Sequence, residues 1–259
     1  MRRSGAFWGA ILVVLGLLLL LDNLNLLPFR VWGVFWPAML ILAGGWILLG
    51  VFVRRSAAAE EARQGLEGAA QARLTIHHGA GRLTGGGGAA SGDLFSGTFV
   101  GGVEQQVTRA GDRLEVELRQ SERGWWSGPW TSDHGLDWGL RLTHAVPLTL
   151  ELNTGAGETR LDLSQVRVTE LTVKTGASST EITLPAAAGH TRVVVEAGAA
   201  AVVLRVPEGV AARIDAGAAV GAVDVDARRF PGQQSPDFET AANRVEITAR
   251  IGAGSLSVV

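Results

Sequence analysis

Two adjacent histidines, His77 and His78, are the residues whose type best suits metal binding. They lie in a stretch whose alternating pattern predicts a strand, and neighbouring residues of a strand point to opposite faces. The two imidazoles therefore cannot readily bind one ion. The sequence also contains no cysteine and no His-x-Glu or His-x3-His spacing of the kind that zinc sites use. We expect no metal site.

Patterns for catalysis or cofactor binding are equally weak. The segment from Gly79 to Thr84 lacks the third glycine of a dinucleotide fingerprint, and no Gly-Lys-Ser/Thr sequence is present. Asp224 and Asp226 share one face of a predicted strand and could act as acid and base, although a solvated face explains them as well. No Gly-x-Ser-x-Gly elbow occurs. We expect neither a catalytic residue nor a bound cofactor.

A tryptophan-rich segment is the candidate interaction surface. It runs from Arg123 to Trp138 and is rich in Gly, Ser, Pro and Asp. One interpretation is that its aromatic side chains cap an end of the folded domain or pack under a loop. The other is an aromatic surface for a partner protein, the bilayer interface or a sugar. The residues of this candidate surface are Trp125, Trp126, Trp130 and Trp138.

Two apolar runs near the N-terminus predict a hairpin of two transmembrane helices, over about 5–27 and 31–53, within a membrane segment 1–55. The second run would span roughly 34 Å as a helix, enough for a bilayer core of about 30 Å. The first run alone also fits a cleaved signal peptide. However, no small-x-small cleavage site follows it, and a second span comes directly after.

Arginines predict the orientation of this hairpin. Arg2 and Arg3 precede the first helix, Arg54 and Arg55 follow the second, and only Arg30 lies between the two. Positive residues favour the cytoplasmic side of a membrane. We therefore expect a two-pass inner-membrane protein, with the lipid bilayer as one partner and the domain that follows in the cytoplasm.

The rest of the chain predicts an all-β domain. Residues 56–72 are rich in Ala, Glu, Gln and Arg, and we expect a partly helical linker there. From residue 73 to residue 259, apolar residues alternate with polar ones, as Leu148, Leu150 and Leu152 do. This period of two is typical of short strands with one buried face.

Gly-Ala pairs fall between these predicted strands at a regular spacing. Gly155, Gly176, Gly198 and Gly217 are 21, 22 and 19 residues apart. A repeat of about 20 residues favours a β-solenoid-like stack of strands joined by Gly-Ala corners. A β-sandwich of hairpins is the alternative, which the regular spacing makes less favourable. The expected structural corners are Gly79, Gly81, Gly155, Gly157, Gly176, Gly198, Gly217, Gly252 and Gly254.

Several segments resemble one known family. Those of the β domain resemble the toast-rack domain of LiaF-like proteins, and Leu-Asp-Asn-Leu-Asn between the two apolar runs is similar to the LiaI–LiaF-like transmembrane region. The resemblance implies a membrane-anchored parallel β-stack with an accessory role in envelope-stress signalling, in which such a protein restrains a membrane sensor kinase. The segments are 21–25, 78–83, 148–163, 174–185, 206–210 and 252–258.

Function can therefore be narrowed by class. The formal net charge is −2 and no basic stripe is present, so we expect no nucleic-acid partner. A glycan lyase on a β-solenoid usually needs clustered carboxylates, arginine or lysine on one face of a much longer solenoid, so we do not expect an enzyme of this kind. The leading hypothesis is a non-catalytic protein-interaction module that binds a sensor kinase or itself, since exposed stack ends can associate. The alternative is a lipid- or glycan-binding module that uses the tryptophan segment.

Overall fold

The computed structural model describes residue 36, residues 39–41, residue 44, and residues 59–121 and 136–259. The chain divides into two compact units, Met1–Arg55 and Ser56–Val259. The two helices expected over 5–27 and 31–53 lie almost wholly outside the described residues. No helix among the residues that are described is both long enough and apolar enough to cross a membrane.

The second unit is a β domain. Its described part contains eleven strands, which form one sheet, and a short 3₁₀ turn, η2. The elements are β1 Ala59–Gly65, β2 Gln71–Gly87, β3 Asp93–Val100, β4 Val103–Ala110, β5 Arg113–Gln120, β6 Trp138–Leu142, β7 Leu148–Asp162, β8 Val168–Thr183, β9 His190–Arg205, β10 Ala211–Val225, η2 Pro231–Gln233 and β11 Arg244–Val258.

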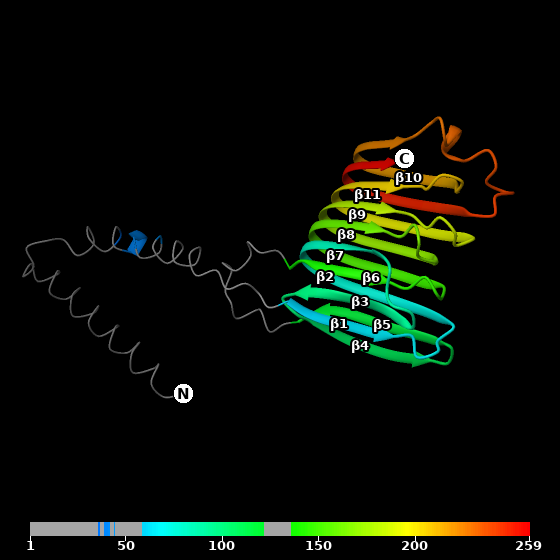
Figure 1. The fold of residues 1–259 in the computed structure, drawn as a ribbon. Coiled ribbons are helices and arrows are strands. Elements are labelled where there is room, and N and C mark those ends of the chain that lie inside the picture. Colours follow the sequence, from blue (N-terminus) through cyan, green and yellow to red (C-terminus); the bar gives the residue numbers. More distant parts are fainter. Residues whose placement is uncertain (1–35, 37–38, 42–43, 45–58, 122–135) are drawn as a thin grey trace, which may run out of the picture. The chain divides into compact units, whose positions relative to one another are not determined.

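Six long parallel strands form the body of the domain, in the order β2-β7-β8-β9-β11-β10. Figure 1 shows them stacked one above the next. Equivalent residues of successive repeats are paired, so that Leu150 lies opposite Leu171 and Leu171 opposite Val193. These apolar rows are fully buried and belong to one core. The parallel register confirms the expected solenoid-like stack rather than a sandwich of hairpins.

The strands are longer than the sequence predicts. We expected short strands that end at each Gly-Ala pair, but β7 continues through Gly155–Gly157 as a single strand of 15 residues. The residues before this corner, Leu148–Thr154, are called its first arm, and Glu158–Asp162 its second arm. Both arms direct apolar side chains into the same core, through Leu150 and Leu161 for example. The ladder persists because adjacent corners also pair with one another.

Close packing of backbone explains the first glycine of most corners. A Cβ on Gly176 would lie 2.6 Å from the carbonyl oxygen of Gly155, and a Cβ on Gly252 would lie 2.8 Å from that of Gly198. Such distances are too short for a side chain. The row of first-corner positions holds Gly79, Gly155, Gly176, Gly198 and Gly252.

The expected corner at Gly217 is wrong. Gly217 lies opposite Arg250, two residues before the corner row, and the position opposite Gly252 is occupied by Ala219. A Cβ on Gly217 would have no neighbour within 4 Å. The Gly-Ala pair at this place in the sequence coincides with the corner motif, but the register of the ladder places the bend two residues later.

The C-terminal strand is inserted into the stack. β11 lies between β9 and β10, so the last strand in sequence is not the last in space. The segment between β10 and β11 folds over the free edge of β10, where Ser235 exchanges two hydrogen bonds with Ala212 at 2.7 and 2.9 Å. Phe230 and Phe238 of this segment are buried. The segment therefore covers the part of β10 before its corner, which would otherwise be an open sheet edge.

Shorter strands close the other end of the stack. β6, β3 and β1 continue the sheet beyond β2, and β5 and β4 form a separate branch from β2. The partly helical linker expected over 56–72 is wrong for its described part, because Ala59–Gly65 is strand β1 and pairs antiparallel with β3. Tertiary pairing with β3 and burial of Leu66 override the helix propensity of this segment.

Candidate functional site

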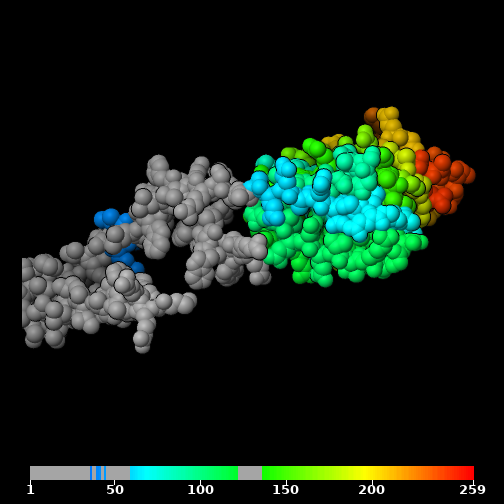
Figure 2. Space-filling model, turned by 60° about the horizontal axis from the view of Figure 1, so that its bottom comes forward, coloured from blue at the N-terminus to red at the C-terminus, as the bar shows by residue number. Residues whose placement is uncertain are grey.

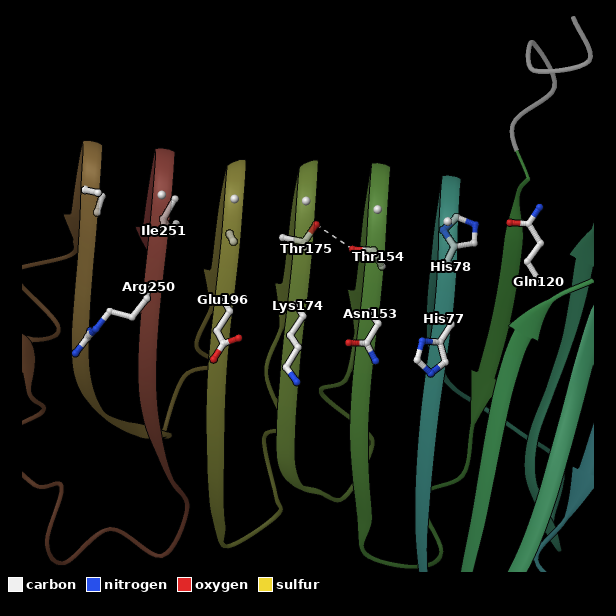
Figure 3. A pocket seen from close by; sticks show the side chains of 18 of the residues that line it. His77, His78, Gln120, Asn153, Thr154, Lys174, Thr175, Glu196, Arg250 and Ile251 are labelled. Atoms are coloured by element: carbon white, nitrogen blue, oxygen red, sulfur yellow. Dashed lines mark hydrogen bonds between the residues drawn. The ribbon is translucent and has the colours of Figure 1, made fainter. Parts of the chain in front are cut away.

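A shallow groove of about 1230 Å³ crosses the six long strands beside their corners (Figure 3). The strands lie about 4.8 Å apart, so the groove extends roughly 24 Å across the stack. The corner glycines leave its upper border without side chains, as the bare Cα positions in Figure 3 show. The groove is therefore a product of the packing that the corners require.

Charged and polar side chains form the outer row of the groove. On five of the six long strands this row lies two residues before the corner glycine, and Lys174 lies between Asn153 and Glu196 in it. On β10 the same position is Gly217, and Arg119 of β5 extends the row beyond His77. In Figure 3 the side chains of Asn153, Lys174 and Glu196 point the same way from neighbouring strands. The row carries both signs of charge, which suits a ligand that is itself mixed in charge. Its members are Arg119, His77, Asn153, Lys174, Glu196 and Arg250.

Ion pairs hold several of these side chains in place. His77 and Arg119 each lie 2.7 Å from a carboxylate oxygen of Glu117, and the hydrogen bond from Arg119 lowers the pKa of Glu117. At the far end, the hydrogen bond from Arg250 at 2.7 Å lowers the pKa of Asp215. Such exposed pairs contribute little to stability. They orient the two ends of the groove.

The side chains in the middle of the groove make fewer ion pairs with the rest of the chain than those at its ends. Lys174 lies 3.6 Å from Glu151, with half of its side-chain surface exposed. Glu196 has no ion pair or hydrogen bond with any residue that the structure describes. Lys174 and Glu196 thus offer a cation and an anion on adjacent strands, each free enough to pair with a bound partner.

The inner row of the groove changes from polar to apolar along the stack. Thr154 donates to Thr175 at 2.9 Å, and Thr175 donates to Ser178 at 2.6 Å, which forms a chain of hydroxyls. Further along, the same row continues with Ala197 and Ile251, both buried. The hydroxyls satisfy one another, so this row provides shape rather than reactive groups.

The two candidate metal-binding histidines separate as the alternation predicts. His77 lies on the outer row, whereas His78 is buried and its Nε2 lies 2.7 Å from the carbonyl oxygen of Leu136. Burial lowers the pKa of His78, because the charged imidazolium would lose its hydration. Within residues 59–121 and 136–259, no group of three metal-binding side chains lies close enough to hold an ion.

The structure differs from expectation most at the candidate interaction surface. Trp125, Trp126 and Trp130 lie outside the described residues. Trp138 was expected on that surface, but it is 1% exposed in β6, with its ring 5.0 Å from Phe99 and 5.1 Å from His78. Trp138 belongs to the core because β6 pairs with both β2 and β3, which places the indole on the buried face of the sheet.

Sequence reasoning missed the groove, although a signal was present. The residues two positions before five corner glycines are all polar or charged: His77, Asn153, Lys174, Glu196 and Arg250. Each one alone is an ordinary exposed strand residue. Only the in-register ladder turns the five positions into one continuous row.

Family models match most of the chain. A model described as the N-terminal domain of toast_rack matches residues 54–205, and one described as the LiaI–LiaF-like transmembrane region matches residues 6–48. No curated protein sequence matches the chain.

One solved structure supports the fold of the β domain. A candidate cell adhesion protein from Clostridium sporogenes is similar with a TM-score of 0.69 and 21% identity, over 78% of this chain and 98% of that one. A candidate adhesin from Bacteroides fragilis matches over 79% of this chain and 98% of its own, with 6% identity. Its TM-score of 0.31 is too low to carry an argument. These likenesses concern fold alone.

Proposed function

The chain belongs to the toast-rack family and carries that family's LiaI–LiaF-like transmembrane region, and from this premise we propose that its groove binds an extended segment of another protein. The observation that carries the proposal is the groove itself, with its row of mixed charges across six strands. A length of roughly 24 Å matches about seven residues of extended chain, at about 3.3 Å each. No catalytic step is part of this function.

The charges in the groove favour a polypeptide partner over an unmodified sugar. Lys174 and Glu196 lie on adjacent strands, and Arg250 follows on the next. Side chains of opposite sign on a peptide could pair with Lys174 and Glu196, whereas Arg250 is already bound to Asp215. Complementary charges of this kind set the register and partner choice more than they raise affinity. The tryptophan alternative has no support from the described residues, because Trp138 is buried.

In its finer form, the proposal is that the bound protein is a membrane sensor kinase in an envelope-stress system. The family resemblance supports this assignment. The arginines around the two apolar runs support a two-pass anchor with the β domain in the cytoplasm. A kinase partner requires this orientation if its cytoplasmic part is to reach the groove.

Orientation is tested by a reporter fused after Val259. An enzyme that is active only in the cytoplasm should be active in this fusion. A matched fusion to a reporter that works only outside the membrane should be silent. If the second reporter alone is active, the arginine argument is wrong and a cytoplasmic partner is untenable.

Occupancy of the groove is tested by crosslinking in intact cells. A photoreactive amino acid at Lys174 should give one discrete adduct with a membrane sensor kinase, identified by mass spectrometry. The matched control is Ser179, which is exposed on the same strand beyond the corner and does not line the groove. Equal labelling at both positions would contradict groove binding. A discrete adduct with another protein would retain the groove and exclude the kinase.

A further inference from the structure

A second cavity, of about 580 Å³, lies over β1, β3, β6 and the part of β2 that follows its corner, at Thr84 and Gly85. Figure 2 shows the exposed surface that the N-terminal strands, in cyan, form at this end of the stack. Three glycines contribute backbone to the lining of the cavity, and Gly139 leaves the sheet face that carries the arginines without a side chain at its position. The three glycines are Gly85, Gly97 and Gly139.

Two arginines, Arg63 and Arg141, line this cavity. Arg63 of β1 is paired with Ser96 of β3, and Ser96 is paired with Arg141 of β6. The three residues thus share one face of the sheet, with the Cα atoms of the arginines about 10 Å apart. Arginine side chains are long enough to meet over the serine hydroxyl between them. The result is a convergent set of donors on one side of the cavity.

Neither arginine has a partner within the part of the chain that the structure describes. Most of the other arginines on the described strands form an ion pair or a hydrogen bond, as Arg82 does with Glu158 at 3.1 Å. Arg63 and Arg141 instead make no ion pair and no hydrogen bond with any described residue. The two positive charges, on strands separated by β3, repel each other weakly, and an anion bound between them would relieve this repulsion. The arrangement therefore favours a bound anion.

The chemistry of the donors indicates which anion. Guanidinium groups bind phosphate oxygens through paired hydrogen bonds, and the Ser96 hydroxyl can add a third donor. One carboxylate, that of Glu61, also lines the cavity, two residues before Arg63 and opposite Thr98. A carboxylate at the rim disfavours a bare polyanion but can accept a hydrogen bond from a hydroxyl. A phosphate monoanion that carries a hydroxylated group fits both features.

We propose that Arg63, Ser96 and Arg141 bind the phosphate of an anionic phospholipid headgroup such as that of phosphatidylglycerol. The family match to the transmembrane region ends at residue 48, and Arg63 follows 15 residues later. A chain of that length reaches at most about 50 Å, so the bilayer surface is the richest source of phosphate within its range. Arg54 and Arg55 lie in the same connecting segment and add attraction to anionic lipid. This site is separate from the groove and does not depend on it.

The binding test uses the full chain in micelles of dodecyl maltoside, a detergent without phosphate, titrated with glycerophosphoglycerol, the water-soluble headgroup. Arg63→Gln and Arg141→Gln should each weaken binding about 10-fold, since each removes a charge-assisted pair. Glu61→Gln should strengthen it. The matched control is Arg192→Gln, an equal loss of charge at an exposed position outside both cavities. Circular dichroism confirms that each variant is folded.

The source of the phosphate is tested by moving the chain from these micelles into phosphatidylcholine nanodiscs that contain phosphatidylglycerol. With about 30% phosphatidylglycerol in the disc, the tethered site should already be filled, and soluble headgroup should bind at least about 10-fold more weakly. Inorganic phosphate serves as the second probe in the micelles. Unchanged headgroup binding in the anionic discs would overturn the lipid assignment in favour of free phosphate. Equal binding by the wild type and both arginine variants would overturn the site.

Discussion

Replacing Gly157 by alanine should destabilise the β domain by about 3 kcal/mol. Gly157 has φ of 135°, a backbone region that alanine adopts only with strain of about 1–3 kcal/mol. Its new Cβ would also overlap the carbonyl oxygen of Gly81 on the adjacent strand. Such overpacking typically costs a further 1–3 kcal/mol. The expected result is a large drop in the midpoint of thermal unfolding, measured by circular dichroism on the full chain in detergent.

A graded series of alanine variants separates steric overlap from a general effect of losing glycine. A Cβ would lie 2.6 Å from a backbone oxygen at Gly176 and 3.0 Å from one at Gly198, whereas nothing lies within 4 Å at Gly217. The loss of stability should therefore decrease in the order Gly157, Gly176, Gly198. Gly217→Ala should be neutral or slightly stabilising, because alanine restricts the unfolded chain.

The strands β8 and β9 show how the position of Gly157 can be occupied by a residue other than glycine. Ser178 and Ala200 occupy the positions equivalent to Gly157 on β8 and β9, without a positive φ. If β7 could adopt the corner of β8, Gly157→Ala would cost little. We expect that it cannot, because Gly81 on the other side also has a positive φ, of 118°. A midpoint close to that of the wild type would show that the corners are interchangeable.

The repeat architecture was predictable because each repeat carries its own signal. Alternation of apolar residues indicates a strand with one buried face, and this depends only on local sequence. The spacing of Gly155, Gly176 and Gly198 then indicates that successive strands stack in register. Close approach of backbones at the corners makes glycine necessary there, so the sequence records the packing directly.

Register and strand order were not predictable, because they depend on interactions between distant segments. Gly217-Ala218 has the sequence of a corner, yet the pairing of β10 with β11 places the corner at Ala219. Nothing local to β11 indicates that it enters between β9 and β10. The strand Ala59–Gly65 was missed for the same reason, since its partner β3 begins 28 residues after Gly65.

The candidate sites show the same division. Both cavities consist of side chains from different strands, brought together by the ladder, as Lys174 and Glu196 are in the groove and Arg63 and Arg141 are in the anion site. No two of these residues are near neighbours in sequence. The composition of the tryptophan segment indicated a candidate interaction surface, but composition cannot distinguish an exposed aromatic side chain from a buried one. Trp138 shows how this distinction depends on the fold.

Trp138→Ala should cost about 3–5 kcal/mol, the usual range for a buried aromatic side chain. The indole is 1% exposed and packs edge-on against Phe99, with ring centroids 5.0 Å apart. Its removal would leave a cavity beneath β6 and take away the ring beside His78. Thermal unfolding of the full chain in detergent, followed by near-ultraviolet circular dichroism, measures the effect.

Trp138→Phe distinguishes loss of apolar volume from loss of the indole N–H. That N–H is buried and has no hydrogen-bond partner in the described part of the chain, so its removal forfeits no bond. Phenylalanine retains most of the apolar surface and should therefore cost about half as much as alanine or less. The exposed Val220→Ala, at 70% exposure, should be neutral. If Trp138→Ala were as stable as the wild type, the placement of the indole in the core would be wrong.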